Sequence, residues 1–494
     1  MRLACTLLGG LAATALAAAS PSSAHPSAPL GRPVHLERRQ DQQQQPASQA
    51  QQEALYQQAM TDPVGAAKVA RALPFIAGQF ATGDLYKYNV AGDGQLPWNS
   101  GVYYQPEATV NGSVDGGWQA LPEIPDFQLN RTWTVKDGAI MPFYQTANYD
   151  PKQIKRAVLV MPGKPRDCWK YTSMMQNALS VEAANSTSGV TNSSVLILGP
   201  CWMNSDDQKA GAVQPNELYW YGSQWQRGEL SRGPGSASIS TYRVLDGFLD
   251  MLFDKDQFPA LNRVVLAGHS MGAQMVQRYA MLKKSRPYDA NVAYWVGNPG
   301  SYAWPSSERT YANSSCADVD TWPYGVGGDT KQLPAYARSD VEANKDAVVA
   351  TYRSRHVHYS LGLLDNGQGD TSCQAATQGA NHLERGCDIV TTLGDMAGGF
   401  PSNHTLNLMP NVSHQDYEMM SYNISLYRLF ADGLDTQEGY TAAAKGAGSR
   451  STGAGGKGGS SSAAAAARMD VASLQAGLAL GAGLAAVAGV LTAL

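Results

Sequence analysis

The stretch that most constrains the fold of this chain spans residues 263–273 and reads R-V-V-L-A-G-H-S-M-G-A. Its first half is a short apolar run that predicts a buried strand, and a helical pattern of apolar residues follows at residues 275–282. Between them the pentapeptide G-H-S-M-G matches G-x-S-x-G, in which a serine occupies a sharp turn from strand to helix. Glycine on both sides avoids the clashes that Cβ atoms would create in such a turn. We therefore predict that Ser270 is a nucleophile, the alternative being a turn without chemical consequence.

Residues 154–429, which contain this stretch, alternate short apolar runs with helical patterns. The runs predict strands at residues 157–161, 195–198, 264–267, 292–296, 358–364 and 405–409, and an amphipathic helix is expected at residues 238–253. Near-continuous apolar strands separated by helices are typical of a parallel sheet that is buried on both faces. The expected fold class is therefore α/β, with a mostly parallel central sheet and helices on both faces.

Residues 75–149 carry a different pattern, in which short aromatic and β-branched runs are broken by glycine, proline and asparagine. The run at residues 132–135 comes shortly before Asp137-Gly138, a dipeptide that favours the tight turn of a β-hairpin. We expect antiparallel edge strands in this part of the chain.

A serine hydroxyl is a poor nucleophile unless a histidine takes its proton, and the histidine needs a carboxylate to hold its tautomer and its cationic form. In an open parallel sheet such groups come from the loops that follow the carboxyl ends of strands. The strand expected at residues 358–364 ends at Asp365, and His414 follows the last expected strand. The order Ser270, Asp365, His414 is the order of α/β hydrolases, so we predict these three residues as the catalytic group.

Other titratable residues compete for these roles. Asp370 lies five residues beyond Asp365 and is the rival carboxylate, whereas His404 opens the last expected strand instead of following it. His356 and His358 form an H-x-H pair, but no cysteine or carboxylate is spaced to complete a metal site, and we expect a structural role for both. No metal and no cofactor is predicted.

An oxyanion hole needs two N–H donors, one from the residue after the nucleophile and one from the loop after an earlier strand. Met271 supplies the first. The loop after the strand at residues 157–161 reads P-G-K-P, and because proline has no N–H, the donors available inside it are Gly163 and Lys164. The choice between these two stays open.

The chain resembles the secreted fungal members of the α/β-hydrolase superfamily, and is distantly similar to enzymes of the polyester-depolymerase and feruloyl-esterase type. The resemblance covers about residues 154–429 and rests on the segments 268–272, 298–302, 361–365, 370–373 and 412–414. It implies the α/β-hydrolase fold and an acyl-enzyme formed on Ser270. The chain departs from this pattern at Pro162-Gly163, where such proteins often have His-Gly.

The connection at about residues 300–340 is too long for a simple loop and is rich in aromatic residues, so we expect a lid over the site. Trp304 belongs to it, and Trp202 and Trp220 follow another strand on the same side of the sheet. These three tryptophans are predicted to form a substrate-binding rim suited to a sugar or aromatic ester. Aromatic packing between loops is an equally good explanation.

Both ends of the chain predict targeting segments. The expected organisation is a signal peptide at residues 1–24, a disordered Pro/Gln-rich leader at 25–62, the hydrolase domain at 63–433, a Gly/Ala/Ser-rich stalk at 434–462 and a GPI-attachment signal at 463–494. An ordinary membrane helix is the alternative for the C-terminal apolar segment. The predicted location is extracellular, on the cell surface or in the cell wall through a lipid anchor.

Entry into the secretory pathway predicts disulfides and glycans. Cys168 and Cys201 each follow a strand and are expected to pair, while Cys316 is expected to pair with Cys373 or Cys387. Glycosylation triplets occur at Asn111, Asn130, Asn185, Asn192, Asn313, Asn403, Asn411 and Asn423.

The composition of the chain limits the kinds of molecule that it is expected to bind. The chain has 494 residues and a net charge of −4, which gives no electrostatic reason to expect nucleic acid. Three functions remain: a serine hydrolase of a small-molecule or cell-wall ester, a non-catalytic surface glycoprotein that keeps the fold, and a serine peptidase. The sequence carries no signal for an oligomeric state.

Overall fold

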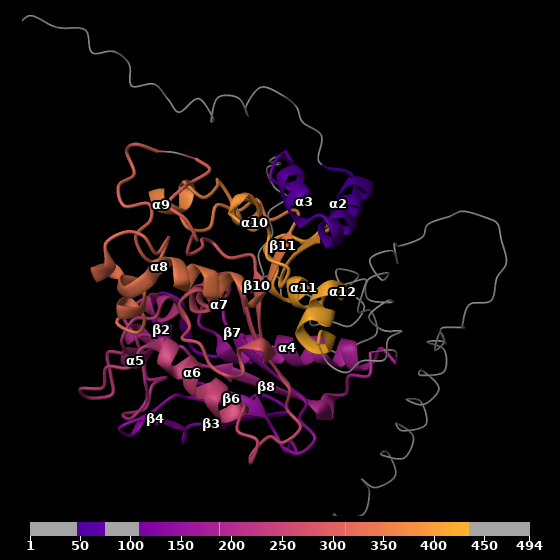
Figure 1. The fold of residues 1–494 in the computed structure, drawn as a ribbon. Coiled ribbons are helices and arrows are strands. Elements are labelled where there is room, and N and C mark those ends of the chain that lie inside the picture. The colour runs from indigo at the N-terminus through magenta and orange to yellow at the C-terminus, as the bar shows by residue number, and fades with distance from the viewer. Residues whose placement is uncertain (1–46, 75–107, 187, 312, 434–494) are drawn as a thin grey trace, which may run out of the picture.

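The computed structural model describes residues 47–74, 108–186, 188–311 and 313–433. Its centre is an eight-stranded sheet with the order β12-β11-β10-β9-β7-β8-β6-β3 (Figure 1). The strands are β3 (Phe127–Asn130), β6 (Phe143–Thr146), β7 (Arg156–Met161), β8 (Val195–Pro200), β9 (Arg263–His269), β10 (Val292–Gly297), β11 (His356–Gly362) and β12 (His404–Met409). Strands β7 to β12 pair in parallel, and β6 and β3 add antiparallel pairs at one edge. The predicted mostly parallel sheet is confirmed, and so are antiparallel edge strands in residues 108–149; residues 75–107 of that prediction lie outside the described residues.

Successive residues of the central strands point to opposite faces, so the sheet contributes to two separate cores. In β7, Ala157 and Leu159 join one core while Val158 and Val160 join the other. The first core also contains residues of α6 (Thr241–Leu252), α7 (Met271–Leu282), α8 (Arg338–Arg353) and α10 (His382–Asp395), and the second those of α4 (Cys168–Ala183), α11 (Asp416–Ser421) and α12 (Asn423–Leu426). Helices therefore cover both faces of the sheet, as predicted (Figure 1).

The parallel strands end at nearly the same level of the sheet. His269 at the end of β9 is opposite Gly297 of β10, and Gly362 of β11 is opposite Met409 of β12. The loops that follow these strands therefore meet at one edge, where open α/β sheets place their sites. A strand, a sharp turn at Ser270 and helix α7 inside such a sheet make this an α/β-hydrolase fold, as predicted.

The N-terminal part of the described chain is not a disordered leader. Residues 47–62 were expected to be disordered as part of the segment 25–62, but they contain helix α2 (Gln49–Thr61), followed by α3 (Pro63–Ala70). Ser48 caps α2, and the helix buries Leu55 and Tyr56 where it packs on β12 and α3. The apolar stripe of α2 is narrow, formed by Leu55, Tyr56 and Ala59. Such a stripe is enough to dock a helix whose other faces are glutamine-rich.

We expect this docking to contribute measurably to stability. Because Leu55 is 4% exposed, Leu55→Ala should lower the free energy of unfolding by about 2–5 kcal/mol in urea titrations of the protein. The exposed Gln57 of the same helix provides the control, since Gln57→Ala should change stability by no more than about 0.5 kcal/mol. Equal stability of both variants would mean that α2 is not docked in solution.

The predicted β-hairpin and the predicted disulfides are confirmed. The hairpin joins β4 (Thr134–Lys136) to β5 (Ala139–Ile140), and Asp137 and Gly138 both have the positive φ of its tight turn. Disulfides link Cys168 to Cys201 and Cys316 to Cys373, which leaves Cys387 as a buried thiol. The second disulfide anchors the connection between β10 and α8 to the segment after Asp370.

That connection, the expected lid, is a packed insertion. Trp322 is 6% exposed, the main-chain carbonyl of Pro323 accepts from Arg278 of α7, and Trp304 bonds through its main-chain N–H to Tyr324. The insertion is therefore fixed to the helix that follows Ser270, as well as by its disulfide. Lid motion over the site stays a prediction.

The asparagines of the glycosylation triplets lie at the surface, where all are exposed except the half-buried Asn130. At Asn411, however, the side-chain amide donates to Gln49 of α2 and the main-chain N–H donates to Gln52 at 2.8 Å. A glycan on Asn411 would therefore compete with the docking of α2. Glycosylation itself stays a prediction.

The predicted signal peptide, stalk and GPI-attachment signal, together with residues 25–46, lie outside the described residues. Within the part of the chain that the structure covers, no helix has both the length and the hydropathy needed to cross a bilayer.

Candidate active site

Ser270 occupies a strained turn between β9 and α7. Its φ of 57° and ψ of −121° lie outside the regions that a non-glycine residue normally adopts. A Cβ on Gly268 would lie 2.7 Å from the main-chain nitrogen of Ala273, and one on Gly272 would lie 2.6 Å from the carbonyl oxygen of Pro162. Both glycines are therefore required by close main-chain packing, and the first turn of α7 rests directly on the loop after β7.

This packing makes Gly272 a sensitive position. We expect Gly272→Ala to destabilise the protein by about 1–3 kcal/mol or more, because main-chain atoms cannot move aside as a side chain can. Any reaction that depends on Ser270 should slow as well, since Ser270 and the loop after β7 would be forced apart. The measurements are urea unfolding and kcat. Gly116→Ala is the control, because its Cβ would meet only the Ser113 hydroxyl in an exposed turn. A neutral Gly272→Ala would contradict the packing described above.

The predicted catalytic residues are brought together. The Nε2 atom of His414 lies 2.9 Å from Oγ of Ser270, and its Nδ1 atom lies 2.7 Å from Oδ2 of Asp365. Asp365 follows β11 and is fully buried, while the side chain of His414, which follows β12, is 12% exposed. The result is a continuous chain of hydrogen bonds from the hydroxyl of the half-buried Ser270 to a fully buried carboxylate.

The loops that carry Asp365 and His414 are tied together by Asn298, which sequence reasoning did not single out as functional. Asn298 follows β10, is fully buried and has a φ of 46°. Its amide donates to the carbonyl oxygen of Ser413 at 2.9 Å, and its side-chain oxygen accepts from the N–H of Gly362 at 2.9 Å. The segment N-P-G-S-Y that begins at this residue was part of the sequence resemblance, and its structural task is to fix the His414 loop.

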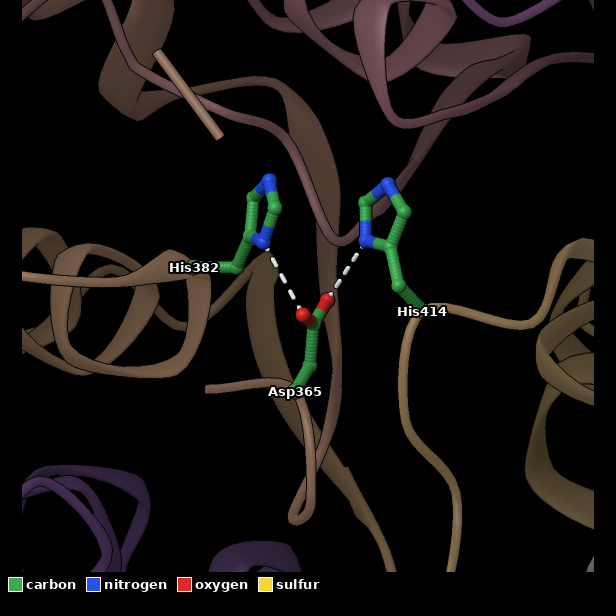
Figure 2. A group of neighbouring side chains, drawn as sticks. All are labelled: Asp365, His382 and His414. Carbon is green, nitrogen blue, oxygen red and sulfur yellow. Dashed lines mark hydrogen bonds and ion pairs between the residues drawn. The ribbon is translucent and has the colours of Figure 1, made fainter. Parts of the chain in front are cut away.

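His382 is a second histidine at Asp365. Its Nδ1 atom lies 2.9 Å from Oδ1 of Asp365, on the opposite side of the carboxylate from His414 (Figure 2). The two imidazole rings stack, with centroids 4.2 Å apart and planes inclined by 18°. Sequence reasoning missed His382 because nothing in its local sequence distinguishes it; Asn381, which caps α10, only marks a helix start.

Burial and the hydrogen bonds to Asp365 together decide the charges in this cluster. Burial by itself would raise the pKa of Asp365, but the two histidines and their hydrogen bonds outweigh it and hold the pKa well below its ordinary value. Burial lowers the pKa of His382, and lowers that of His269 to well below the usual range. Asp365 is therefore an anion, and His382 and His269 are neutral. Because a carboxylate only accepts, both histidines that face Asp365 donate from Nδ1.

The loop after β7 lies beside the elbow. The Tyr171 hydroxyl, 3.3 Å from Nδ1 of His269, would be 2.7 Å from a Cβ on Gly163. Within the described residues, no acceptor is recorded for the main-chain N–H of Met271, Gly163 or Lys164. The loop after β7 therefore packs against the elbow, while the oxyanion roles of Met271 and of Gly163 or Lys164 stay predictions.

The rival residues lie elsewhere. Asp370 accepts hydrogen bonds from Ser301 at 2.9 Å and from Tyr324 at 3.0 Å. His404 is buried beside the carbonyl of Tyr352. His358 bonds to Thr405 at 2.9 Å and, like His356, belongs to β11, near the end of the strand away from Ser270.

The predicted aromatic rim is wrong for this structure. Trp202, Trp220 and Trp304 are each 0% exposed and belong to the first hydrophobic core. Periodicity cannot tell whether an aromatic residue in an irregular segment points inward or outward, and here the large apolar area of each indole is buried. These tryptophans are core residues and present no surface to a ligand.

Asp365, His382 and His414 also form the one group in the described residues with three potential metal ligands in close proximity. However, each carboxylate oxygen is already paired with a donating ring nitrogen at hydrogen-bond distance. Hydrogen bonds account for the short distances between these three side chains, so we assign no metal to the cluster.

No protein-family model and no curated protein matches this chain. Among solved structures, it is similar to a poly(aspartic acid) hydrolase from Sphingomonas sp. KT-1, with 16% identity, a TM-score of 0.40, and coverage of 60% of this chain and 95% of that one. A poly(3-hydroxybutyrate) depolymerase from Bordetella parapertussis shows 18% identity, a TM-score of 0.41 and coverage of 63% and 90%. A siderophore hydrolase from Aspergillus nidulans shows 11% identity, a TM-score of 0.35 and coverage of 64% and 100%. Because one fold hosts many chemistries, none of these activities is transferred to this chain.

Proposed function

We propose that this chain is a serine hydrolase that cleaves carboxylic esters through an acyl-enzyme on Ser270. One observation carries the proposal: the chain of hydrogen bonds from Ser270 through His414 to Asp365, with lengths of 2.9 Å and 2.7 Å. Such a chain activates a hydroxyl that is otherwise a weak nucleophile.

In this proposal Oγ of Ser270 attacks the ester carbonyl carbon while Nε2 of His414 takes the hydroxyl proton. The imidazolium donates from Nδ1 to Asp365, which holds its orientation and balances its charge. The main-chain N–H groups of Met271 and of Gly163 or Lys164 stabilise the oxyanion.

When the tetrahedral intermediate collapses, the C–O bond to the alcohol breaks and His414 returns the proton to the leaving oxygen. Water then enters, His414 takes a proton from it, and the hydroxide attacks the acyl carbon. As the bond between the acyl carbon and Oγ breaks, His414 gives its proton to Oγ, which releases the carboxylic acid and regenerates the Ser270 hydroxyl.

We further propose that the protein acts outside the cell, carries glycans at some of its asparagine triplets and is held at the surface by a lipid anchor. The two disulfides support an oxidising compartment, because such bonds are rare in proteins of the cytosol. Expression of the full chain in a eukaryotic host tests this proposal. We expect phosphatidylinositol-specific phospholipase C to release the protein from the cell surface and mass spectrometry of the released protein to show glycans, whereas protein that stays on the cells would contradict the lipid anchor.

The test of the reaction uses the full chain with p-nitrophenyl esters of increasing acyl length, and with matched p-nitroanilides. We expect ester turnover and, in acid-quenched samples, an intact mass increased by one acyl group that maps to Ser270. Preferential cleavage of the anilides would favour a peptidase. A folded protein with neither turnover nor adduct would favour the non-catalytic surface glycoprotein.

A further inference from the structure

The carboxylate of Asp365 is held from two sides. His414 bonds to Oδ2 and His382 bonds to Oδ1, as the dashed lines in Figure 2 show. The reaction proposed for Ser270 needs the first of these bonds but not the second. Asp365 is fully buried, so its second oxygen also needs a hydrogen-bond partner. That partner is His382, and the reaction proposed for Ser270 does not by itself explain why it is a histidine.

His382 is itself firmly placed. It is the first residue of α10, its main-chain N–H donates to the carbonyl of Gly367 at 3.0 Å, and the next N–H of the helix donates to the carbonyl of Asp365 at 3.1 Å. A Cβ on Gly369 would collide with the outer edge of the His382 ring, which is 4% exposed. The loop from Asp365 to Gly369 thus wraps around the start of α10 and encloses this side chain.

The bond from His382 fixes the orientation of the carboxylate. A buried carboxylate with one partner can rotate about its last side-chain bond, and each tilt changes the angle at which Oδ2 meets Nδ1 of His414. With Oδ1 also bound, the plane of the carboxylate is set. Both donors are N–H groups of neutral or transiently charged imidazole, so the anion keeps its charge.

The ring of His382 also restrains the ring of His414. At a centroid distance of 4.2 Å and an inclination of 18°, the stacked rings limit rotation of His414. His414 must keep its plane while Nε2 passes a proton first from Ser270 to the leaving group and then from water. A fixed ring favours both transfers.

We infer that His382 is a positioning residue: its Nδ1–H orients Asp365 and its ring restrains His414, which keeps the base aligned with Ser270. This inference rests on the proposed function. The side-chain contacts of His382 described above are with Asp365 and His414 and not with Ser270, so its effect is expected on kcat and not on KM.

Three substitutions separate the hydrogen bond from the ring. His382→Asn keeps a donor at the position of Nδ1, His382→Phe keeps a stacking ring, and His382→Leu removes both. We expect His382→Leu to lower kcat by about 10- to 100-fold, the usual effect of losing a hydrogen bond to a charged group, with KM changed less than about twofold. His382→Asn should recover most of this loss, and His382→Phe only a small part.

The control is His358, another buried histidine whose Nδ1 bonds to a single partner, Thr405, away from the site. His358→Leu should leave kcat unchanged, and thermal unfolding of every variant shows whether it is folded. If His382→Leu does not fold, the comparison of His382→Asn with His382→Phe still decides, because the first keeps the hydrogen-bond donor and the second keeps the ring.

The outcomes are distinct. Wild-type kcat in folded His382→Leu, a loss confined to KM, or equal activities of the Asn and Phe variants would overturn the positioning role while leaving the proposed function intact. An inactive wild type would overturn the proposed function and the inference with it.

Discussion

Ser270→Ala is expected to lower kcat for ester hydrolysis by about 10⁴-fold or more, the loss seen when the nucleophile of a hydrogen-bonded serine group is removed. The substitution deletes one oxygen atom, whose recorded partner is Nε2 of His414. The main-chain N–H of residue 270 still donates to Gly297, so the elbow should persist. Binding of the substrate and the oxyanion donors should account for any residual rate.

The measurement is steady-state kcat with a p-nitrophenyl ester, beside thermal unfolding of the same samples. Ser421→Ala is a suitable control, since it deletes the hydroxyl of another serine, one that is fully buried and bonds within α11 to Tyr417. It should retain kcat even if its unfolding temperature falls. A folded Ser270→Ala variant with more than about a tenth of wild-type activity would place the chemistry elsewhere.

Asp365→Asn should have the second-largest effect, a fall in kcat of about 10³- to 10⁴-fold. The carboxylate accepts from two histidines, whereas an amide offers one oxygen and one NH₂ group. If the NH₂ group faces His414, that ring must carry its proton on Nε2 and cannot accept one from Ser270. If it faces His382, His414 keeps its tautomer but loses the anion that balances its charge.

Asp370→Asn is the matched control for this substitution. Asp370 is the neighbouring carboxylate, but it bonds to Ser301 and Tyr324. We expect the kcat of the Asp370→Asn variant to change by less than about tenfold. A larger loss of kcat in Asp370→Asn than in Asp365→Asn would make Asp370 the catalytic carboxylate. The wild-type pH profile adds a further check: because the pKa of Asp365 is held well below its ordinary value, activity lost on mild acidification is not due to protonation of Asp365.

The parts of the site that could be predicted from sequence lie on regular elements. Apolar strands with sharp ends locate their loops to within a residue or two, so Ser270, Asp365 and His414 were found by asking which polar residues follow strands. The elbow added a local motif whose two glycines the main-chain packing requires. The disulfide between Cys168 and Cys201 was predicted for the same reason, since both cysteines follow neighbouring strands.

What could not be predicted depends on contacts between distant segments. His382 is placed by the way the loop after Asp365 wraps around the start of α10, and no periodic pattern encodes that path. Helix α2 was mistaken for part of a leader because its glutamines conceal a stripe that needs β12 to be buried. The burial of Trp304 is not predictable from sequence, because the folding of an irregular insertion decides which of its aromatic rings enter the core.

The central claim is that Ser270 is an activated nucleophile, and a fluorophosphonate probe tests it without assuming a substrate. The full chain and its Ser270→Ala variant would be treated with the probe, digested and mapped by mass spectrometry. The account predicts stoichiometric labelling of the wild type at Ser270 and none of the variant. Absence of labelling in a folded wild-type protein, or labelling at another residue, would contradict it.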